Sequence, residues 1–463
     1  MSFATNKILL LFFCGLFFNS IAQKEFHTFT KSDGLTSSNI LITKVDHKGI
    51  IWAGTNSGIN AFTGEEWVPI KSISDSKGNK NNIGRVFRFF EAINGDFWVV
   101  SEKGLFVFNG EYWTYFNDTE NDGFHVTDIF EDRRGWIWVI MEKTSSLKDI
   151  GDIGFSLVDG IIQMYNGQRW HKFPSKIGGS AAVTIGDPME YFTSHIQDVK
   201  GNIWVTNLDG LYKFDGKQWE EFNEEQLPSD ICYKVIETSE KEIWVATKYG
   251  IAKLVGDDWV KFEKNRGLKG NQINNLFEDE EKRIWTTTRK DNRFSSICVY
   301  NNGKWKPFFK DKVKIKGAKS QLIDFDNQLI VFSKKGIFFY EEKKWNSLDE
   351  KYNIIDDNFA NLTVLKNSSL CFSGEKGLYS LVSDSLQLLL SPEKTWKVTS
   401  IFESSKGEIW VGTEKKGVYV ISSNEAIKYT VDNGLNDNFI KEIFEDKQRN
   451  IWIVTKSGIS KFL

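Results

Sequence analysis

A pattern of about 40 residues recurs along this chain. Its second strand carries a tryptophan in eight copies, at Trp52, Trp98, Trp138, Trp204, Trp244, Trp285, Trp410 and Trp452. The stretches GIIWAGTNSGINAFTGEEW (49–67) and GNIWVTNLDGLYKFDGKQW (201–219) show the pattern clearly. Two degenerate copies place Ile330 and Cys371 at the tryptophan position, which brings the number of units to ten. A repeat of this length indicates one supersecondary unit per copy, each stacked on its neighbours.

Each unit contains four short apolar runs separated by Gly or Asn turns. Runs of this length with period-two character are typical of antiparallel hairpins, so one unit reads as a four-stranded meander. The share of 14% aromatic residues and the count of six prolines also suit strands. A four-stranded sheet cannot bury both faces alone, and a ring of such sheets solves this problem. The sequence therefore predicts an all-β fold, a β-propeller of four-stranded antiparallel blades with about ten repeats.

The two ends of the sequence complement each other. The tenth unit stops at Leu463 after its third strand, and residues 25–35 match the outer strand and loop of other units, such as 427–435. We therefore expect the N-terminal strand to complete the last blade and close the ring, because a free edge would otherwise remain. A division into two smaller rings stays open as the alternative.

Two units are longer than the others. Unit three carries insertions at Met141–Gly160 and Ser175–Pro188, and unit six carries a smaller one around Lys290–Ser296. Insertions in repeat proteins lie in loops on one face and often carry binding residues, although most surface loops are simply solvated.

Residues 1–22 have the features of a cleavable secretory signal. Lys7 precedes the apolar run Ile8–Phe18, and Ser20 and Ala22 are small residues before a cleavage point. We therefore expect the propeller to occupy residues 23–463 and the mature protein to be periplasmic or extracellular. No later stretch approaches the roughly 20 apolar residues of a membrane span, so no transmembrane segment is predicted. The 59 basic and 62 acidic residues are spread along the chain, which argues against a nucleic-acid partner.

Neither a metal nor a cofactor is predicted. Cys232, Cys298 and Cys371 show no ligand spacing and are expected to be small buried residues in strands. Asp118–Gly123 begins like a calcium loop, but Ile129 stands where the bidentate Glu belongs. The five histidines match no metal or nucleophile motif, so no catalytic residue is predicted.

The entry to the first and last units carries a second motif. Thr30–Leu35 (TKSDGL) and Thr430–Leu435 (TVDNGL) precede an Asp-x-x-Gly turn and the Trp strand. This combination closely resembles the two-component regulator propeller repeat. The resemblance implies a periplasmic sensor domain of the kind found in hybrid histidine kinases, where such repeats help to detect carbohydrate fragments. Residues 1–463 include neither an immunoglobulin-like spacer nor a kinase domain, so we expect a free-standing sensor with a separately encoded sensor kinase as candidate partner.

The start of each inner strand is the position where a ligand-binding rim is expected. It lies 13 residues before the Trp position, and the side chains there differ from unit to unit, as those at a ligand mouth do. The candidate ligand-binding residues are Asn39, Arg85, His125, Tyr191, Gln272, Asn358, Lys397 and Phe439, with Ile231 and Gly317 at the same position of the two other units. Strand starts are also exposed positions that tolerate any residue, which is the simpler explanation. The repeated tryptophans and the Asp-x-x-Gly aspartates are expected to be core residues and turn formers.

Three functions fit these observations. The first is a binding or sensor module for a glycan or a partner protein, and the second is a polysaccharide or streptogramin-like lyase. The third is a structural component of the cell envelope. A lyase needs a base, and among the rim candidates His125 is the only histidine and has no acidic companion. The sequence therefore favours a binding protein that is not an enzyme.

Overall fold

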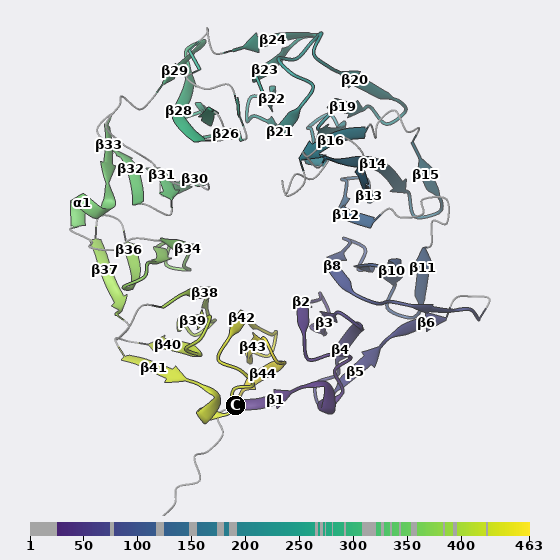
Figure 1. Cartoon of the computed structure of the whole chain (residues 1–463), viewed down its shortest axis with the longest axis vertical. Coiled ribbons are helices and arrows are strands. Elements are labelled where there is room, and N and C mark those ends of the chain that lie inside the picture. The colour runs from purple at the N-terminus through teal and green to yellow at the C-terminus, as the bar shows by residue number, and fades with distance from the viewer. Residues whose placement is uncertain are drawn as a thin grey trace, which may run out of the picture.

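The computed structural model places ten small β-sheets one after another around a single ring (Figure 1). It describes residues 26–463 except 75–77, 117–124, 148–154, 174–179, 185–191, 264–266, 269–271, 274, 280, 291–292, 308–320, 326–327, 334–335, 342–343, 353–358, 383–384, 392–395 and 423–424. Each sheet is one blade of a β-propeller, and its strands follow one another antiparallel from the centre of the ring outward. The predicted fold class is confirmed.

The strands of the first five blades are as follows. Blade 1 contains β2 (Ile40–Val45), β3 (Ile51–Thr55), β4 (Gly58–Phe62) and β5 (Trp67–Ile70), and blade 2 contains β8 (Val86–Glu91), β9 (Phe97–Ser101), β10 (Gly104–Phe108) and β11 (Trp113–Phe116). Blade 3 contains β12 (His125–Glu131), β13 (Ile137–Leu147), β14 (Phe155–Tyr165), β15 (Trp170–Lys172) and β16 (Ser180–Thr184). Blade 4 contains β17 (Phe192–Gln197), β18 (Ile203–Asn207), β19 (Gly210–Phe214) and β20 (Trp219–Phe222), and blade 5 contains β21 (Cys232–Glu237), β22 (Ile243–Thr247), β23 (Gly250–Val255) and β24 (Asp258–Phe262).

The other five blades complete the ring. Blade 6 contains β25 (Gln272–Ile273), β26 (Phe277–Glu278), β27 (Ile284–Lys290), β28 (Arg293–Asn301) and β29 (Lys304–Pro307), and blade 7 contains β30 (Gln321–Phe325), β31 (Gln328–Ser333), β32 (Gly336–Glu341) and β33 (Lys344–Ser347). Blade 8 contains β34 (Ala360–Val364), β35 (Leu370–Ser373), β36 (Leu378–Val382) and β37 (Ser385–Leu390), and blade 9 contains β38 (Val398–Glu403), β39 (Ile409–Thr413), β40 (Val418–Ser422) and β41 (Glu425–Tyr429). Blade 10 contains β42 (Ile440–Glu445), β43 (Ile451–Thr455), β44 (Ile459–Phe462) and β1 (Phe26–Phe29). A hairpin of β6 (Ser72–Ser74) and β7 (Lys80–Asn82), the helix α1 (Leu348–Tyr352) and the 3-10 turns η1 (Lys31–Asp33) and η3 (Val431–Asn433) lie outside the sheets.

The N-terminal strand is the outer strand of the last blade, as the sequence predicted. In the antiparallel pairing of β1 with β44, Phe26 lies opposite Phe462 and Phe29 lies opposite Ile459. Phe29 also packs with Trp67 of blade 1 and Trp452 of blade 10 in one buried cluster. The first and last blades therefore contact each other, which rules out two smaller rings.

The core lies between the blades. Nine buried clusters each join two consecutive blades, and seven of the eight second-strand tryptophans lie in them. The eighth, Trp285, is buried as well. In six of these interfaces the second-strand tryptophan meets an outer-strand tryptophan of the next blade edge to face, with ring centroids 5.9–6.4 Å apart and planes at 84–90°. Edge-to-face pairs at this distance are favourable beyond the area that they bury. The predicted core role of the tryptophans is confirmed.

The recurrent aspartates of the turns accept hydrogen bonds from the tryptophan indoles. In five blades the aspartate accepts a hydrogen bond of 2.7–3.0 Å from the indole Nε1 of the second-strand tryptophan, and the pairs are Asp46–Trp52, Asp132–Trp138, Asp198–Trp204, Asp279–Trp285 and Asp446–Trp452. Asp46 also accepts the backbone N–H groups of Lys48 and Ile50, which closes the turn. The aspartates are thus turn formers, as expected, and indole acceptors as well.

Blade 2 lacks this acceptor. Ala92 stands at the aspartate position, and the Nε1 of Trp98 has no hydrogen-bond partner among the described residues. Trp98 is 1% exposed, so this donor is also shielded from water. An unpaired buried donor of this kind is a cost to stability.

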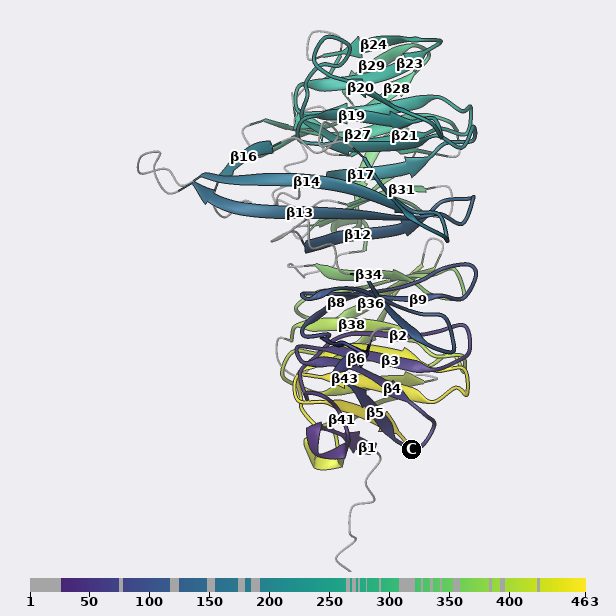
Figure 2. The same ribbon diagram turned by 90° about the vertical axis from the view of Figure 1, so that its right-hand side faces the viewer.

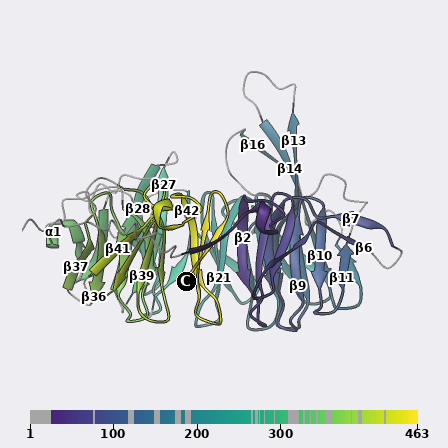
Figure 3. The same cartoon turned by 90° about the horizontal axis from the view of Figure 1, so that it is seen from below.

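Blade 3 carries a projection from the ring. Its strands β13 and β14 pair from Ile137–Tyr165 to Leu147–Phe155, and β16 adds to the distal part of β14. The resulting three-stranded extension stands out from one face of the ring (Figures 2 and 3). The predicted insertion at Met141–Gly160 is therefore an extended hairpin, and the smaller insertion in blade 6 likewise lengthens β27 and β28.

Several sequence-based predictions lie wholly or partly outside the described residues. They are the signal at 1–22, the loop Asp118–Gly123 and parts of Ser175–Pro188. Cys232, Cys298 and Cys371 are buried and form no disulfide with one another, as expected. In the described part of the chain, no helix is long and apolar enough to cross a membrane.

Candidate functional site: the inner strands of blades 2 to 4

The inner strands all begin on the face from which the blade 3 hairpin projects. In blade 3, His125 at the start of β12 lies opposite Glu142, and β13 continues beyond this pair to Leu147. The hairpin thus extends past the beginning of the inner strand (Figure 3). We call this side of the ring the loop face.

The predicted rim residues that the structure describes lie at the beginnings of inner strands, each in a different blade. Asn39, Arg85, His125 and Lys397 are exposed, whereas Gln272 and Phe439 are half-buried, as is Ile231. Tyr191, Asn358 and Gly317 lie outside the described residues. This spacing around the ring does not bring the rim residues together into one compact site.

The side chains of three rim residues contact neighbouring side chains. The Nζ of Lys441 donates a hydrogen bond of 2.8 Å to the Oδ1 of Asn39, and the Nζ of Lys397 lies 3.1 Å from the Oε1 of Glu414. The guanidinium of Arg85 lies 5.6 Å from the centre of the Phe87 ring. Lys397 also lines a pocket of about 310 Å³ together with Trp396, Thr413 and the lysines that follow Glu414.

A β-bulge recurs near the start of the inner strands. The pairing register shifts near the start of the strand in eight blades. It shifts at the second residue in seven of them, for example between Val86 and Arg88, and at the third residue in blade 3, between Val126 and Asp128. A bulge redirects the side chains that follow it, and bulges are frequent beside functional sites. The side chains that follow the bulge are therefore candidates for a functional site.

Three charged or polar side chains meet just after this bulge, and we call them the inner-strand cluster. They are Arg88 of blade 2, Asp128 of blade 3 and His195 of blade 4. The Nη1 of Arg88 forms an ion pair with the Oδ1 of Asp128, and the Nδ1 of His195 lies 3.3 Å from the Oδ2 of the same carboxylate. The side chains are 45%, 29% and 29% exposed, so the cluster is partly open to solvent.

The imidazole of His195 is held from two sides. Its ring stacks on Phe130 with centroids 3.9 Å apart and planes at 11°, while Asp128 contacts its Nδ1. Burial lowers the pKa of His195 below its ordinary value, and Lys234 and Arg88 lower it further, whereas Asp128 acts in the opposite direction. His195 is therefore a neutral imidazole at pH 7, able to donate one hydrogen bond and accept another.

The sequence-based search missed this cluster because it sampled the first position of each inner strand. Arg88 and Asp128 occupy the same register position three residues further on, and His195 lies one residue beyond its counterpart, Ser194. An alignment of the units at that position places Arg88, Asp128 and Lys234 in a single column. Charged residues in an inner strand were the signal that could have identified the site.

The described residues contain no group of three or more metal-binding side chains. The inner-strand cluster offers hydrogen bonds and charge. Arg88 supplies a planar set of donors, Asp128 supplies acceptors and His195 supplies one of each. Such a set can orient hydroxyl, amide or carboxylate groups of a ligand.

Comparisons with known proteins agree with the repeat that the sequence resembles. Residues 434–457 match the family model of the two component regulator propeller. Histidine kinase P4 of Formosa agariphila is 42% identical over 69 residues, which cover 13% of this chain and 5% of that protein. The extracellular domain of a putative hybrid two component system from B. thetaiotaomicron has 18% identity and a TM-score of 0.28, covering 94% of this chain and 65% of that chain. A virginiamycin B lyase from Staphylococcus aureus has 13% identity and a TM-score of 0.31, covering 58% of this chain and 93% of that chain.

The fold thus defines the class of the protein as a ten-bladed β-propeller with a polar cluster on its inner strands. Within that class, the repeat at residues 434–457 is similar to the two component regulator propeller, in agreement with the resemblance found in the sequence. The matched segment spans a small part of the curated kinase, and the structural likenesses identify neither a ligand nor a reaction.

Proposed function

We propose that this protein is an exported binding or sensor module that recognises a glycan or a partner protein on the loop face of blades 2 to 4. The observation that supports this proposal is the inner-strand cluster, because Arg88, Asp128 and His195 converge from three blades. The longest insertion belongs to the middle of these blades and projects from the same side. A partly open set of donors and acceptors beside a large loop suits ligand recognition.

The resemblance to sensor propellers suggests how binding is used. In this proposal the occupied propeller acts on a separately encoded sensor kinase, and the chain reaches the periplasm or cell exterior through the signal at 1–22. N-terminal sequencing of the secreted protein tests the export step. The expected first residue is Gln23, and a protein that keeps residues 1–22 inside the cell would contradict it.

The alternative function, a propeller lyase, has one specific observation in its favour. A neutral imidazole beside a carboxylate, as in His195 and Asp128, is the arrangement of a general base. His195 is therefore a better candidate for that role than His125, which is exposed at the start of its strand. Asp128 also forms an ion pair with Arg88, so its carboxylate is shared between Arg88 and His195. This sharing favours ligand binding over proton transfer.

A thermal-shift screen of the mature protein against oligosaccharides, followed by analysis of every hit for cleavage, tests both functions. A rise in melting temperature with the ligand intact supports binding, whereas products with new unsaturated ends would establish the lyase. Asp128→Asn keeps the shape of the site and removes its charge, so the shift should disappear. Ser400→Ala is the matched control, because Ser400 occupies the same register position in blade 9. A shift that survives in Asp128→Asn would contradict the proposed site.

A further inference from the structure

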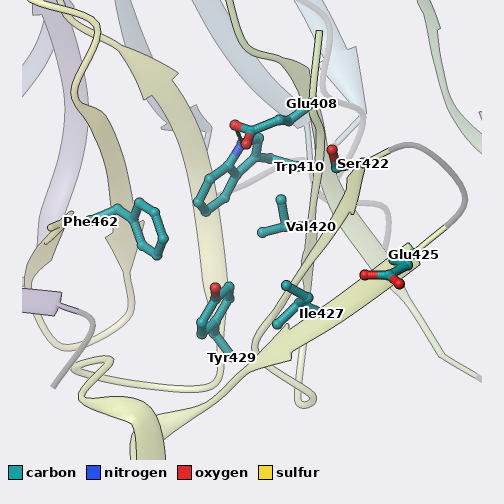
Figure 4. Close-up of a pocket in the computed structure, with 8 residues that line it drawn as sticks. All are labelled: Glu408, Trp410, Val420, Ser422, Glu425, Ile427, Tyr429 and Phe462. Atoms are coloured by element: carbon teal, nitrogen blue, oxygen red, sulfur yellow. Dashed lines mark hydrogen bonds between the residues drawn. The ribbon is translucent and has the colours of Figure 1, made fainter. Parts of the chain in front are cut away.

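A second pocket lies between blades 9 and 10, where the two ends of the chain meet. It has a volume of about 450 Å³ and is lined by the aromatic rings of Trp410, Tyr429 and Phe462, with the carboxylates of Glu408 and Glu425 beside them (Figure 4). Among the described residues that line it there is no lysine, arginine or histidine. The pocket therefore combines aromatic faces with negative charge.

The interface between blades 9 and 10 departs from the repeat in its outer strand. At six other interfaces an outer-strand tryptophan of the next blade stands edge-on against the second-strand tryptophan. In blade 10 that outer strand is β1, and the register of β1 with β44 places Phe26 at the tryptophan position. Trp410 meets Phe462 with ring centroids 5.1 Å apart, as Trp244 meets Tyr300 at 4.8 Å.

Blade 5 shows how the same set of residues holds a cation. There the Nζ of Lys253 lies 5.1 Å from the centre of the Trp244 ring and 5.9 Å from that of Tyr300 in blade 6. The same ammonium group lies 2.7 Å from the Oε1 of Glu242, whose Oε2 accepts the indole N–H of Trp244 at 3.2 Å. One carboxylate and two aromatic rings thus surround one ammonium group.

Blade 9 repeats every part of this arrangement except the lysine. Glu408 accepts the indole N–H of Trp410 at 3.3 Å, as Glu242 does for Trp244. Phe462 occupies the place of Tyr300, and the angle between its ring and Trp410 is 75°, compared with 69° in blade 5. The residue paired with Trp410 is Val420, whereas the residue paired with Trp244 is Lys253. Neither Glu408 nor Glu425 has an ion-pair partner within the described part of the chain.

We propose that this pocket binds an alkylammonium group, such as a lysine side chain of another molecule or a free amine. Aromatic faces and a carboxylate attract an ammonium ion through cation–π and charge interactions, and both are stronger when the site is partly shielded from water. In blade 5 the chain supplies this group itself, and in blade 9 a ligand supplies it. The pocket is formed by β39, β40, β41 and β44 and is separate from the inner-strand cluster, so this site does not depend on the proposed function.

Calorimetric titration of the whole mature chain with three probes tests the proposal. The probes are n-butylammonium, a lysine blocked at both ends and the equally blocked norleucine, which has a similar shape without the charge. We expect the two ammonium probes to bind roughly tenfold more tightly than norleucine. Tighter binding of the blocked lysine would identify a protein side chain as the source, and tighter binding of butylammonium would identify a free amine. Equal binding of all three probes, or none, would overturn the proposal.

Two variants locate the site. Val420→Lys supplies the missing ammonium group from within the chain and should abolish binding, while Glu408→Gln should weaken it by roughly tenfold through the loss of one charged contact. Val107→Lys is the matched control, because Val107 pairs with Trp98 at the same register position of blade 2 and is equally buried. Melting curves show whether each variant folds. Undiminished binding by a folded Val420→Lys or Glu408→Gln protein would refute the assignment.

Discussion

Removal of the carboxylate that holds a tryptophan indole should destabilise the ring by a predictable amount. Asp46 is 6% exposed and accepts three hydrogen bonds of 2.9 Å, from the backbone N–H groups of Lys48 and Ile50 and from the Nε1 of Trp52. In Asp46→Ala the indole N–H stays buried without an acceptor, which costs about 2 kcal/mol. The two turn N–H groups can reach water and add about 0.5 kcal/mol each. The expected loss is therefore about 3 kcal/mol in the free energy of unfolding.

The reverse substitution is available in blade 2. Ala92→Asp places a carboxylate where the unpaired Nε1 of Trp98 needs an acceptor. Burial of the new charge offsets part of the gain, so we expect a stabilisation of about 1 kcal/mol. The opposite signs of the two substitutions distinguish this explanation from a general sensitivity of the turns.

Urea unfolding followed by tryptophan fluorescence measures both effects, with the midpoint compared at unchanged slope. Asp46→Asn serves as control, because it keeps an oxygen acceptor and should lose only about half as much as Asp46→Ala. The reasoning would be refuted if Asp46→Ala unfolded at the same urea concentration as the wild type, or if Ala92→Asp unfolded earlier.

Three further predictions follow from single residues. The pKa of His195 is lowered from 6.5 in the folded chain, so the unfolded chain binds this proton first and the contribution of His195 to stability should fall as the pH drops below about 6.5. NMR titration should show a still lower pKa in Asp128→Asn, because Asp128 raises the pKa of His195. An unchanged or higher pKa in this variant would contradict the prediction. Gly58→Ala should lower the free energy of unfolding by about 2 kcal/mol, since Gly58 has a φ of +125° and a Cβ there would lie 2.6 Å from the carbonyl oxygen of Ile70. Gly64→Ala is the control, because Gly64 has open space around it, and it should lower the free energy of unfolding less in the same assay. Burial raises the pKa of the Cys371 thiol to about 12, so this cysteine should react with a thiol reagent only after unfolding, and rapid labelling of the native protein would be inconsistent with the structure.

The repeat made the architecture predictable from the sequence. Turn residues and alternating apolar runs define each blade locally, and the match of residues 25–35 to other outer strands predicted the pairing of β1 with β44. The burial of Trp204 and its counterparts followed from their recurrence at one position. These features depend on short-range sequence patterns that recur from unit to unit.

The candidate site was less predictable because it depends on contacts between blades. Arg88, Asp128 and His195 are far apart in the sequence, and their meeting depends on how far each bulge shifts an inner strand. The sequence showed His125 as the histidine nearest to the rim, but His195 is the histidine that joins the inner-strand cluster through Asp128. The pocket at Trp410 likewise depends on two blades, because Phe462 of blade 10 completes a lining that blade 9 otherwise supplies.

The proposed site is tested most directly by NMR of the mature protein labelled at its histidine side chains, with and without an oligosaccharide found in the thermal-shift screen. The imidazole signals of His195 should move on addition of the ligand, while those of His47, which pairs with Glu91 outside the cluster, should stay in place. A saturating ligand that leaves the His195 signals unchanged would show that recognition takes place elsewhere on the protein.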